Sequence, residues 1–325
     1  MNRNVCVYLD FLTPAQEETM ATCAKENGYT IAFFSPDQLE QAKEHAQSCQ
    51  AIIANSPALL QAAPATLEWY ACPNAGVEGY CNNPDWFKNP NTILTNCAGA
   101  YGVTIGEHMV MVTIMMMRNE LLYTTAATEH RWGITQPMRS IRGSRVTVVG
   151  TGDIGCSFAA HVKAMGASHV TGLSRSGKAR TNDFDTMLTI DQLESVLPTS
   201  DVIALSLPNT PETAGLLTRE RLAMLPTSAY LVNVGRGNVL DQEALMDALN
   251  NDQLAGAAID VMIPEPLPSD HPLWDTKNII ITPHVAGDMS LGYTADKAVS
   301  IFCENMAHFA KGEPLNHTVD RTKGY

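Results

Sequence analysis

Three side chains of complementary chemistry follow three consecutive apolar runs in the last third of the sequence. Arg236 follows the first run in the segment NVGRG, Glu265 follows the second in DVMIPEP, and His284 follows the third in TPH. If these runs are parallel strands of one sheet, their carboxyl ends share one edge, which is where ligands bind in open α/β sheets. We therefore expect an arginine, a carboxylate and an imidazole to lie together.

This set of groups suits the reduction of a carbonyl that neighbours a carboxylate. Arg236 can hold the substrate carboxylate through two charge-assisted hydrogen bonds and polarise the adjacent carbonyl. His284 can donate the proton as a hydride arrives, and accept it in the reverse reaction. Glu265 can orient the imidazole and favour its protonated form. Each residue alone also fits a structural role, but the placement of all three at one predicted edge favours chemistry.

The elements that must position these residues form a repeating pattern of apolar runs and helical or turn sequence after residue 144. Six strands with helical crossovers are what a doubly wound dinucleotide-binding sheet requires. The six runs are Val146–Val149, Val170–Leu173, Val202–Leu205, Tyr230–Val232, Ala257–Ile259 and Ile279–Ile281.

A glycine motif opens this region. The segment RVTVVGTGDIG places Gly150, Gly152 and Gly155 directly after the first predicted strand, and a helical pattern follows. Gly150 permits a tight turn, Gly152 lets backbone amides approach a pyrophosphate, and Gly155 allows the helix to pack closely on the sheet. The order of strand, motif, helix and second strand predicts a dinucleotide-binding turn.

The second predicted strand ends at residues that favour NADP over NAD. A carboxylate at this place would bind the ribose hydroxyls of NAD and repel a 2′-phosphate. This chain instead has Ser174, Arg175 and Ser176, followed by Lys178 and Arg180 with no carboxylate among them. Because a guanidinium group binds phosphate well, we expect NADP. The alternative is that these cations form an ordinary solvated loop and that NAD is the cofactor.

The N-terminal hundred residues also alternate between apolar runs and helical sequence such as Pro14–Asn27, which predicts a parallel sheet covered by helices. The apolar runs there are Val5–Leu9, Thr30–Phe34 and Ala51–Ala54. Residues 103–122 are apolar almost all round, which predicts one helix buried on most sides. Its methionines fit either an interior helix or a partner surface. A last helix, near Thr294–Ala310, is expected to return to the first domain.

Composition narrows the class of protein. The 325 residues, 45% hydrophobic and 17% charged, exclude a disordered chain and suffice for about two domains. A net charge of −13 disfavours nucleic acid or an anionic membrane as partner. The longest apolar run, Met109–Met117, is too short for a membrane span, and the N-terminus lacks a secretory-signal layout. The eight cysteines are scattered without a CxxC, so we expect no metal site, no disulfide framework and a cytoplasmic location.

Four long blocks resemble the signature segments of the NAD(P)-dependent D-isomer-specific 2-hydroxyacid dehydrogenases. They are LSLPNTPETAGLL, AYLVNVGRGNVLDQEAL, GAAIDVMIPEPLPSDHPLW and NIIITPHVAG, in that family's order. The resemblance implies an α/β fold with two doubly wound parallel-sheet domains and a cleft between them. Residues 99–288 would form the Rossmann cofactor domain, and residues 1–98 with 289–325 a flavodoxin-like substrate-binding domain. It also implies a homodimer formed mainly through the cofactor domains.

The resemblance also implies site residues. Arg236, Glu265 and His284 match the family's catalytic residues, and Asp260 matches the residue near the nicotinamide carboxamide. The cofactor-binding set expected from the motif and the resemblance together is Gly150, Gly152, Asp153, Ile154, Gly155, Ser174, Arg175, Ser176, Leu207, Pro208, Thr213, Val234, Gly235, Asp260, His284 and Gly287. The substrate-binding set is Ala75, Gly76 and Val77, from the segment NAGVEG, with Arg236 and His284.

The leading hypothesis is a reductase of small 2-keto acids, such as glyoxylate or hydroxypyruvate, that uses NADPH. One alternative is a nucleotide-sensing binding protein like the family's corepressors, and another is an NAD-dependent hydroxyacid oxidiser. The family's formate dehydrogenases carry Gln in place of Glu265, so that activity is disfavoured. Met262 and Ile263 stand where relatives often have a Glu and an aromatic residue, which leaves Glu265 in register.

Overall fold

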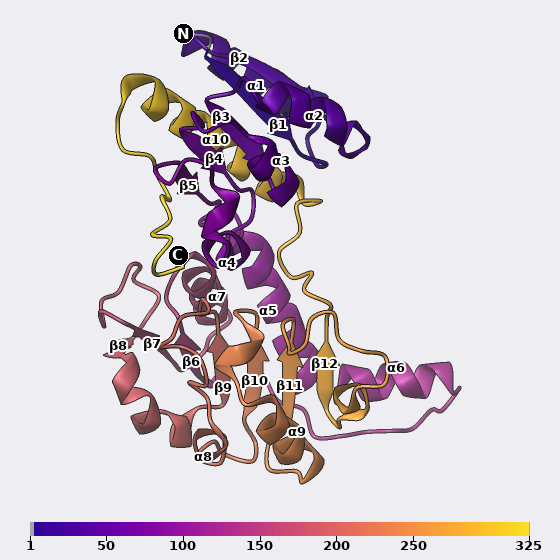
Figure 1. Cartoon of the computed structure of the whole chain (residues 1–325). Coiled ribbons are helices and arrows are strands. Elements are labelled where there is room, and N and C mark those ends of the chain that lie inside the picture. The colour runs from indigo at the N-terminus through magenta and orange to yellow at the C-terminus, as the bar shows by residue number, and fades with distance from the viewer. Residues whose placement is uncertain (1–2, 325) are drawn as a thin grey trace. The chain divides into compact units, whose positions relative to one another are not determined.

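The computed structural model describes residues 3–324, which divide into two units (Figure 1). The first unit comprises the chain up to Tyr101 together with the part from Asp288 onward. The second unit is Gly102–Gly287. Each contains its own parallel β-sheet and hydrophobic core, so the expectation of an α/β protein with two parallel sheets is confirmed.

The first unit has a five-stranded sheet in the order β2-β1-β3-β4-β5, the flavodoxin-like doubly wound order. Its strands are β1 (Asn4–Tyr8), β2 (Thr30–Phe34), β3 (Ala51–Ala54), β4 (Trp69–Ala71) and β5 (Ile93–Thr95). Strands β2 and β3 coincide with the predicted runs, and β1 lies one residue earlier than the predicted Val5–Leu9. Strands β4 and β5 have only three residues each, too few to show as separate apolar runs, and were not predicted.

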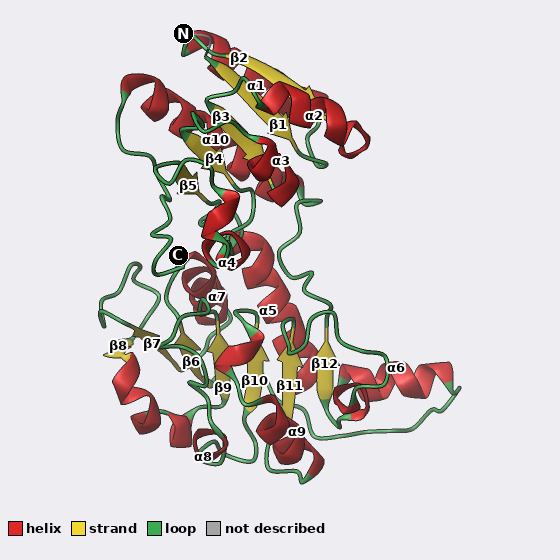
Figure 2. Cartoon of the chain, viewed as in Figure 1, coloured by secondary structure: helices red, strands yellow, loops and turns green. Residues whose placement is uncertain are grey.

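Helices cover this sheet in the order expected of alternating strands and helices (Figure 2). They are α1 (Pro14–Glu26), α2 (Leu39–Ala46), α3 (Pro57–Ala62), α4 (Glu78–Cys81) and α10 (Gly292–Lys311). Helix α1 begins at Pro14 because Thr13 forms a capping box with Gln16: each side chain binds the backbone amide of the other residue.

Helix α10 returns to the first unit, as predicted. It packs against α1, where the Gln16 side-chain amide donates to Asp296 at 2.8 Å. The ring of Phe309 lies 6.0 Å from that of Tyr29 and 5.5 Å from that of Trp69. The following tail then forms a β-bridge from Thr318 to Thr95 in β5. The first unit is thus built from both ends of the described chain.

The second unit has a seven-stranded parallel sheet in the order β12-β11-β10-β9-β6-β7-β8, the Rossmann arrangement. Its strands are β6 (Arg145–Val149), β7 (His169–Ser174), β8 (Thr186–Thr189), β9 (Val202–Leu205), β10 (Tyr230–Asn233), β11 (Gly256–Ile259) and β12 (Ile279–Ile281). The sequence predicted six of these. The missed strand, β8, lies at the sheet edge, where all four residues of TMLT are only partly buried, so it has no continuous apolar run.

The helices of the second unit flank this sheet, except for the helix at Glu120–Thr128, which extends away from it (Figure 2). They are α5 (Gly102–Met117), α6 (Glu120–Thr128), α7 (Asp153–Ala164), α8 (Arg219–Leu222) and α9 (Gln242–Asn250). The single helix predicted over 103–122 is wrong, because the chain breaks at Asn119, whose φ is +56°. Helix α5 itself is an interior helix, since only Glu107 and Met111 of its residues are exposed. Glycines at 102 and 106 let it approach α7 closely.

Three observations complete the fold. Within residues 3–324, no helix has both the length and the apolar composition needed to cross a membrane. All eight cysteines are free thiols. In the same part of the chain, His, Cys, Asp and Glu side chains do not gather into a group that could hold a metal ion.

Candidate active site

The glycine motif forms the turn between β6 and α7, and each glycine has a distinct geometric reason. Gly150 has φ +98°, a conformation that other residues rarely adopt. A Cβ on Gly155 would lie 1.9 Å from the Gly150 carbonyl oxygen, so only glycine allows α7 to begin here. A Cβ on Gly152 would meet no atom within 4 Å, so the space in front of the helix N-terminus is open. Asp153 and Ile154 lie in the first turn of α7. This open, amide-lined turn fits the pyrophosphate of a dinucleotide.

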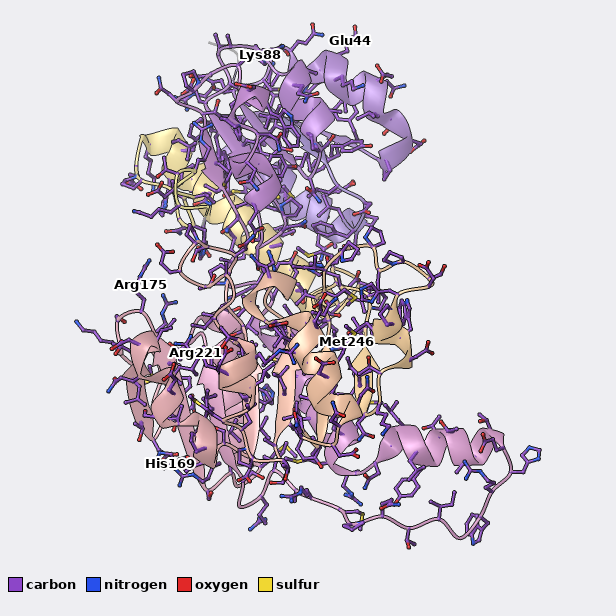
Figure 3. All side chains as sticks on the ribbon, turned by 60° about the horizontal axis from the view of Figure 1, so that its bottom comes forward. Glu44, Lys88, His169, Arg175, Arg221 and Met246 are labelled. Carbon is purple, nitrogen blue, oxygen red and sulfur yellow. The ribbon has the colours of Figure 1, made fainter. Side chains whose placement is uncertain are left out.

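The loop after β7 carries the predicted 2′-phosphate residues. The hydroxyl of Ser174 accepts a hydrogen bond from the Gly177 amide at 3.1 Å, and Gly177 has φ +63°, so the chain turns sharply. Arg175 and Ser176 are exposed at this turn, as are Lys178 and Arg180. Figure 3 shows the Arg175 side chain reaching outward from the ribbon. The turn after β7 therefore carries serine hydroxyls and basic side chains close together in the sequence.

A carboxylate from another loop also lies near Arg175. Glu212 belongs to the segment after β9, so the sequence around β7 could not reveal it. Hydrogen bonds from Thr210 and from its own backbone, with a further contribution from the Arg175 charge, lower the pKa of Glu212. The Glu212 carboxylate is therefore a negative charge near Arg175, whose guanidinium is expected to bind the 2′-phosphate of NADP.

The loops after β9, β10 and β12 hold the other expected cofactor residues along the same edge. Thr213 braces the first of these loops, because its hydroxyl accepts from the Thr210 amide at 2.9 Å and donates to the Pro208 carbonyl at 2.6 Å. The remaining residues are Leu207 after β9, Val234 and Gly235 after β10, and Gly287 after β12.

Arg236 follows β10 and is inserted between the loops that follow the two neighbouring strands. A Cβ on Gly235 would lie 2.6 Å from the Leu207 carbonyl oxygen, and one on Gly237 would lie 2.6 Å from the Met262 backbone. The two glycines therefore allow this loop to fit between its neighbours. Buried Asn233, which the sequence analysis did not single out, accepts from the Gly235 amide and donates to the Arg236 carbonyl, each at 3.1 Å.

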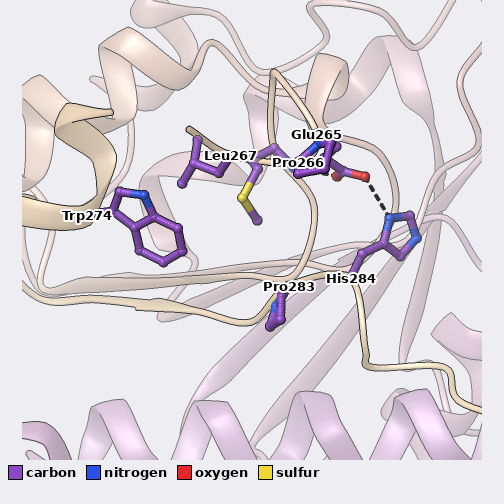
Figure 4. A pocket seen from close by; sticks show the side chains of 7 residues that line it. Glu265, Pro266, Leu267, Trp274, Pro283 and His284 are labelled. Carbon is purple, nitrogen blue, oxygen red and sulfur yellow. Dashed lines mark hydrogen bonds and ion pairs between the residues drawn. The ribbon is translucent and has the colours of Figure 1, made fainter. Parts of the chain in front are cut away.

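Glu265 and His284 form a pair across the loops that follow β11 and β12. Nδ1 of His284 lies 2.8 Å from Oε2 of Glu265 (Figure 4). The other carboxylate oxygen accepts from the Met262 amide at 2.9 Å. The His284 side chain remains 51% exposed, and its backbone has φ +55°, an unusual conformation for a non-glycine residue. Two neighbouring loops thus fix the imidazole while leaving it accessible.

Asp260, at the end of β11, holds the loop that carries His284. Its buried carboxylate accepts from the Thr282 hydroxyl at 2.6 Å and from the amides of Val285 and Ala286 at 2.9 and 3.1 Å. His108 of α5 lies 3.4 Å from the same hydroxyl, and burial lowers the pKa of His108. Both oxygens of Asp260 therefore take part in positioning the segment from 282 to 286.

A pocket of about 410 Å³ adjoins the pair. Its lining is mostly apolar and comprises Met262, Glu265, Pro266, Leu267, Trp274, Pro283 and His284. Figure 4 shows the pocket on the Nδ1 side of the imidazole, whereas the Nε2 edge points away from Trp274.

The expected substrate loop belongs to the first unit. Ala75, Gly76 and Val77 follow β4, and the Asn96 side chain, after β5, donates to the Ala75 carbonyl at 2.8 Å. The Cys97 amide donates to the Asn74 backbone carbonyl at 3.1 Å. This loop therefore lies at the carboxyl edge of the first sheet, whereas Arg236, Glu265 and His284 share the carboxyl edge of the second.

Comparisons with known proteins show which family the chain belongs to. The family model described as D-isomer specific 2-hydroxyacid dehydrogenase, NAD binding domain, matches residues 110–286. Glyoxylate/hydroxypyruvate reductase A of Klebsiella pneumoniae (strain 342) is 32% identical over 227 residues, which cover 69% of this chain and 70% of that protein.

Solved structures give the same result over almost the whole chain. A D-isomer specific 2-hydroxyacid dehydrogenase family protein from Aeromonas salmonicida subsp. salmonicida has a TM-score of 0.83 at 30% identity, covering 99% of this chain and 100% of that one. An NADPH-dependent glyoxylate/hydroxypyruvate reductase from Sinorhizobium meliloti, in complex with NADP and sulfate, has a TM-score of 0.80 at 26% identity, covering 99% and 100%. The chain is an oxidoreductase that belongs to the D-isomer specific 2-hydroxyacid dehydrogenase family.

Proposed function

We propose that this enzyme reduces a small 2-oxo acid to the D-2-hydroxy acid with NADPH, through Arg236, Glu265 and His284. The observation that carries the proposal is the 2.8 Å contact between Nδ1 of His284 and Oε2 of Glu265. The pair follows β11 and β12, and Arg236 follows β10, the next strand of the sheet. An acid–base group with its orienting carboxylate thus lies along the same sheet edge as a guanidinium.

In this mechanism the proton moves through Nε2 of His284. The carboxylate of Glu265 can only accept, so Nδ1 carries the hydrogen that points at it. Nε2 then donates its proton to the substrate oxygen, and recovers one from the hydroxyl in the reverse direction. The nicotinamide, when bound, supplies the hydride. Arg236 binds the substrate carboxylate and draws electron density from the adjoining carbonyl.

We assign the backbone amides of Ala75, Gly76 and Val77 to the substrate carboxylate, with Asn96 fixing their loop. Glyoxylate and hydroxypyruvate are the proposed substrates. This assignment is supported by the names of the relatives at 30–32% identity, which include glyoxylate/hydroxypyruvate reductases and a glyoxylate reductase.

We assign NADPH rather than NADH to the turn after β7. The hydroxyls of Ser174 and Ser176 and the charge of Arg175 are the groups that would hold a 2′-phosphate, since charge-assisted contacts to phosphate are strong. Two solved relatives at 26% identity contain NADPH or NADP, which supports this choice. Glu212 near Arg175 opposes it, because its carboxylate would repel the phosphate.

We propose that the enzyme is a homodimer whose second copy covers the segment after α6. Trp132 is fully exposed there and Met138 is 61% exposed, although both side chains are large and apolar. Large apolar side chains left exposed on one segment are what an interaction surface would cover. Analytical ultracentrifugation tests this: the wild type should sediment as a dimer and a Trp132→Ser, Met138→Ser variant should dissociate more readily. A monomeric wild type would contradict it.

Steady-state assays of a panel of 2-oxo acids with NADPH and with NADH test the catalytic proposal. We expect glyoxylate and hydroxypyruvate to give the highest kcat/KM, and chiral analysis of the glycerate formed from hydroxypyruvate to show the D-isomer. Full activity in a His284→Ala, Glu265→Ala double variant would overturn the assigned mechanism.

A further inference from the structure

Gln242, the first residue of α9, makes a two-point contact with the backbone of the loop that carries Glu265. Its Nε2 donates to the Ile263 carbonyl at 2.7 Å, and the Ile263 amide donates to its Oε1 at 2.9 Å. The side-chain amide of Gln242 is therefore paired with both backbone polar groups of one residue, its N–H and its C=O. This geometry fixes the position and the orientation of the backbone at Ile263.

The contact lies two residues from Glu265 and continues into its carboxylate. The Met262 amide donates to Oε1 of Glu265 at 2.9 Å, while Oε2 is 2.8 Å from Nδ1 of His284. Gln242 therefore holds the segment 262–265 at Ile263. This short segment places the Glu265 carboxylate against the imidazole of His284.

Helix α9, which carries Gln242, is itself firmly fixed in the second unit. Asp241 caps it by accepting from the Ala244 amide at 2.9 Å, and Leu245 and Leu249 are fully buried in the core of the second unit. A side chain at the first position of an anchored helix has its backbone fixed, so its amide can locate a loop that has no regular secondary structure of its own.

The exposed location of Ile263 indicates that the two hydrogen bonds from Gln242 fix the position of the loop and add little to the stability of the fold. Ile263 as a residue is 51% exposed, so its backbone lies near the surface, where water can replace Gln242 if that side chain is removed. Hydrogen bonds that water can replace contribute little net free energy, whereas a buried unsatisfied group would be costly. The contact is thus suited to placing the loop.

We propose that Gln242 is a positioning residue that keeps the Glu265 carboxylate on Nδ1 of His284. The proposal rests on the roles proposed above for Glu265 and His284. Gln242 binds the backbone of Ile263 and not the imidazole of His284 or the glycine turn after β6. Its effect therefore reaches His284 only through Ile263 and Glu265.

Two substitutions separate positioning from folding. Gln242→Met keeps the length of the side chain and removes both hydrogen bonds. Gln242→Glu keeps an acceptor for the Ile263 amide but places a second oxygen against the Ile263 carbonyl, while its charge suits the first turn of a helix. Because sub-ångström misplacement of catalytic groups is costly, we expect each variant to lower kcat about 10- to 100-fold. The KM and Kd for NADPH and the melting temperature should change little.

Gln192→Met is the matched control. Gln192 also binds backbone through its side chain, accepting from the Thr189 amide at 3.2 Å at the edge strand β8, away from the loops that carry the proposed catalytic residues. Its kcat should equal that of the wild type. An equal loss in this control, or a Gln242→Met variant whose kcat falls only together with its melting temperature and its cofactor affinity, would overturn positioning in favour of a general structural role.

A double-mutant cycle with Glu265→Ala completes the test. If Gln242 acts through Glu265, adding Gln242→Met to the Glu265→Ala variant should lower kcat less than twofold, because the positioned group is gone. Independent, multiplicative losses would overturn the inference. A Glu265→Ala variant with wild-type kcat would instead refute the proposed function, whereas an impaired Glu265→Ala with unimpaired Gln242 variants would refute the inference alone.

Discussion

Glu265 and His284 are joined by one hydrogen bond of 2.8 Å, and the backbone of the segment after β11 holds each of them a second time. The Met262 amide holds Glu265, and the His284 amide donates to the Asp260 carbonyl at 2.9 Å. The pair is therefore preorganised by hydrogen bonds made within the second unit. Preorganisation of this kind reduces the reorganisation needed in the transition state.

Removing the imidazole should stop catalysis without stopping cofactor binding. General acid catalysis contributes about 10²- to 10⁴-fold, so His284→Ala should lower kcat/KM for glyoxylate reduction by that order. Fluorescence titration should give an NADPH Kd within a few-fold of the wild type. Near-normal turnover would mean that another group supplies the proton.

Replacing Glu265 by Gln should lower the rate of reduction while leaving the fold intact. Gln has nearly the same shape as Glu, but its side-chain amide can turn a donor towards Nδ1 of His284, which then loses its acceptor. We expect kcat/KM to fall about 10- to 100-fold, because the imidazole is no longer held in one orientation. Steady-state kinetics and melting temperatures of the two enzymes check this. A Glu265→Gln variant with wild-type kinetics would remove the orienting role of Glu265.

Arg236→Lys should separate charge from geometry. An ammonium keeps the positive charge but cannot make two parallel hydrogen bonds to a carboxylate. A hydrogen bond to a charged group contributes about 1.5–3 kcal/mol, so kcat/KM should fall about 10- to 150-fold. The Kd for NADPH serves as the internal control and should not move. Wild-type kinetics in the Lys variant would contradict the assigned role.

The cofactor assignment makes a sharp prediction about the turn after β7. Arg175→Ala should weaken NADPH about 5- to 150-fold and leave NADH nearly unchanged, and Ser174→Asp should shift the preference towards NADH. The preference should shrink with added salt because the turn is exposed. Arg219→Ala removes another exposed arginine, one paired with Asp247, and should have no effect. A wild type that prefers NADH would show that the turn is only a solvated basic loop.

Gly237→Ala tests how closely the loops fit. The added Cβ would lie 2.6 Å from the Met262 backbone and should push away the segment that carries Glu265. We expect kcat to fall at least tenfold with a modest loss of melting temperature. Gly292→Ala is the control, since a Cβ there meets no atom within 4 Å. Equal behaviour of the two variants would show that the loops yield easily.

The sequence predicted most of what depends on apolar runs and fixed motifs. Strands β6, β7, β9, β10, β11 and β12 are continuous buried runs, and the three glycines of the turn are dictated by sterics. It could not predict β8, whose residues are only partly buried, or the break at Asn119, where the apolar pattern continues through a left-handed residue. The grip of Gln242 on Ile263 was also hidden, because a polar residue at a helix start normally faces solvent. Such contacts depend on tertiary packing between segments 21 residues apart.

The construction of the first unit from both ends of the described chain affects how the polypeptide folds during synthesis. Residues of the second unit form one continuous stretch and can fold as soon as they leave the ribosome. The first unit cannot finish until α10 has been made, because α10 covers α1 and the Thr318 bridge extends β5. Until then, apolar surface around Trp69 and Tyr29 lacks Phe309 as its cover. During synthesis the chain therefore passes through a stage in which the sheet of the first unit is incompletely covered, and at that stage a chaperone can bind the exposed apolar residues.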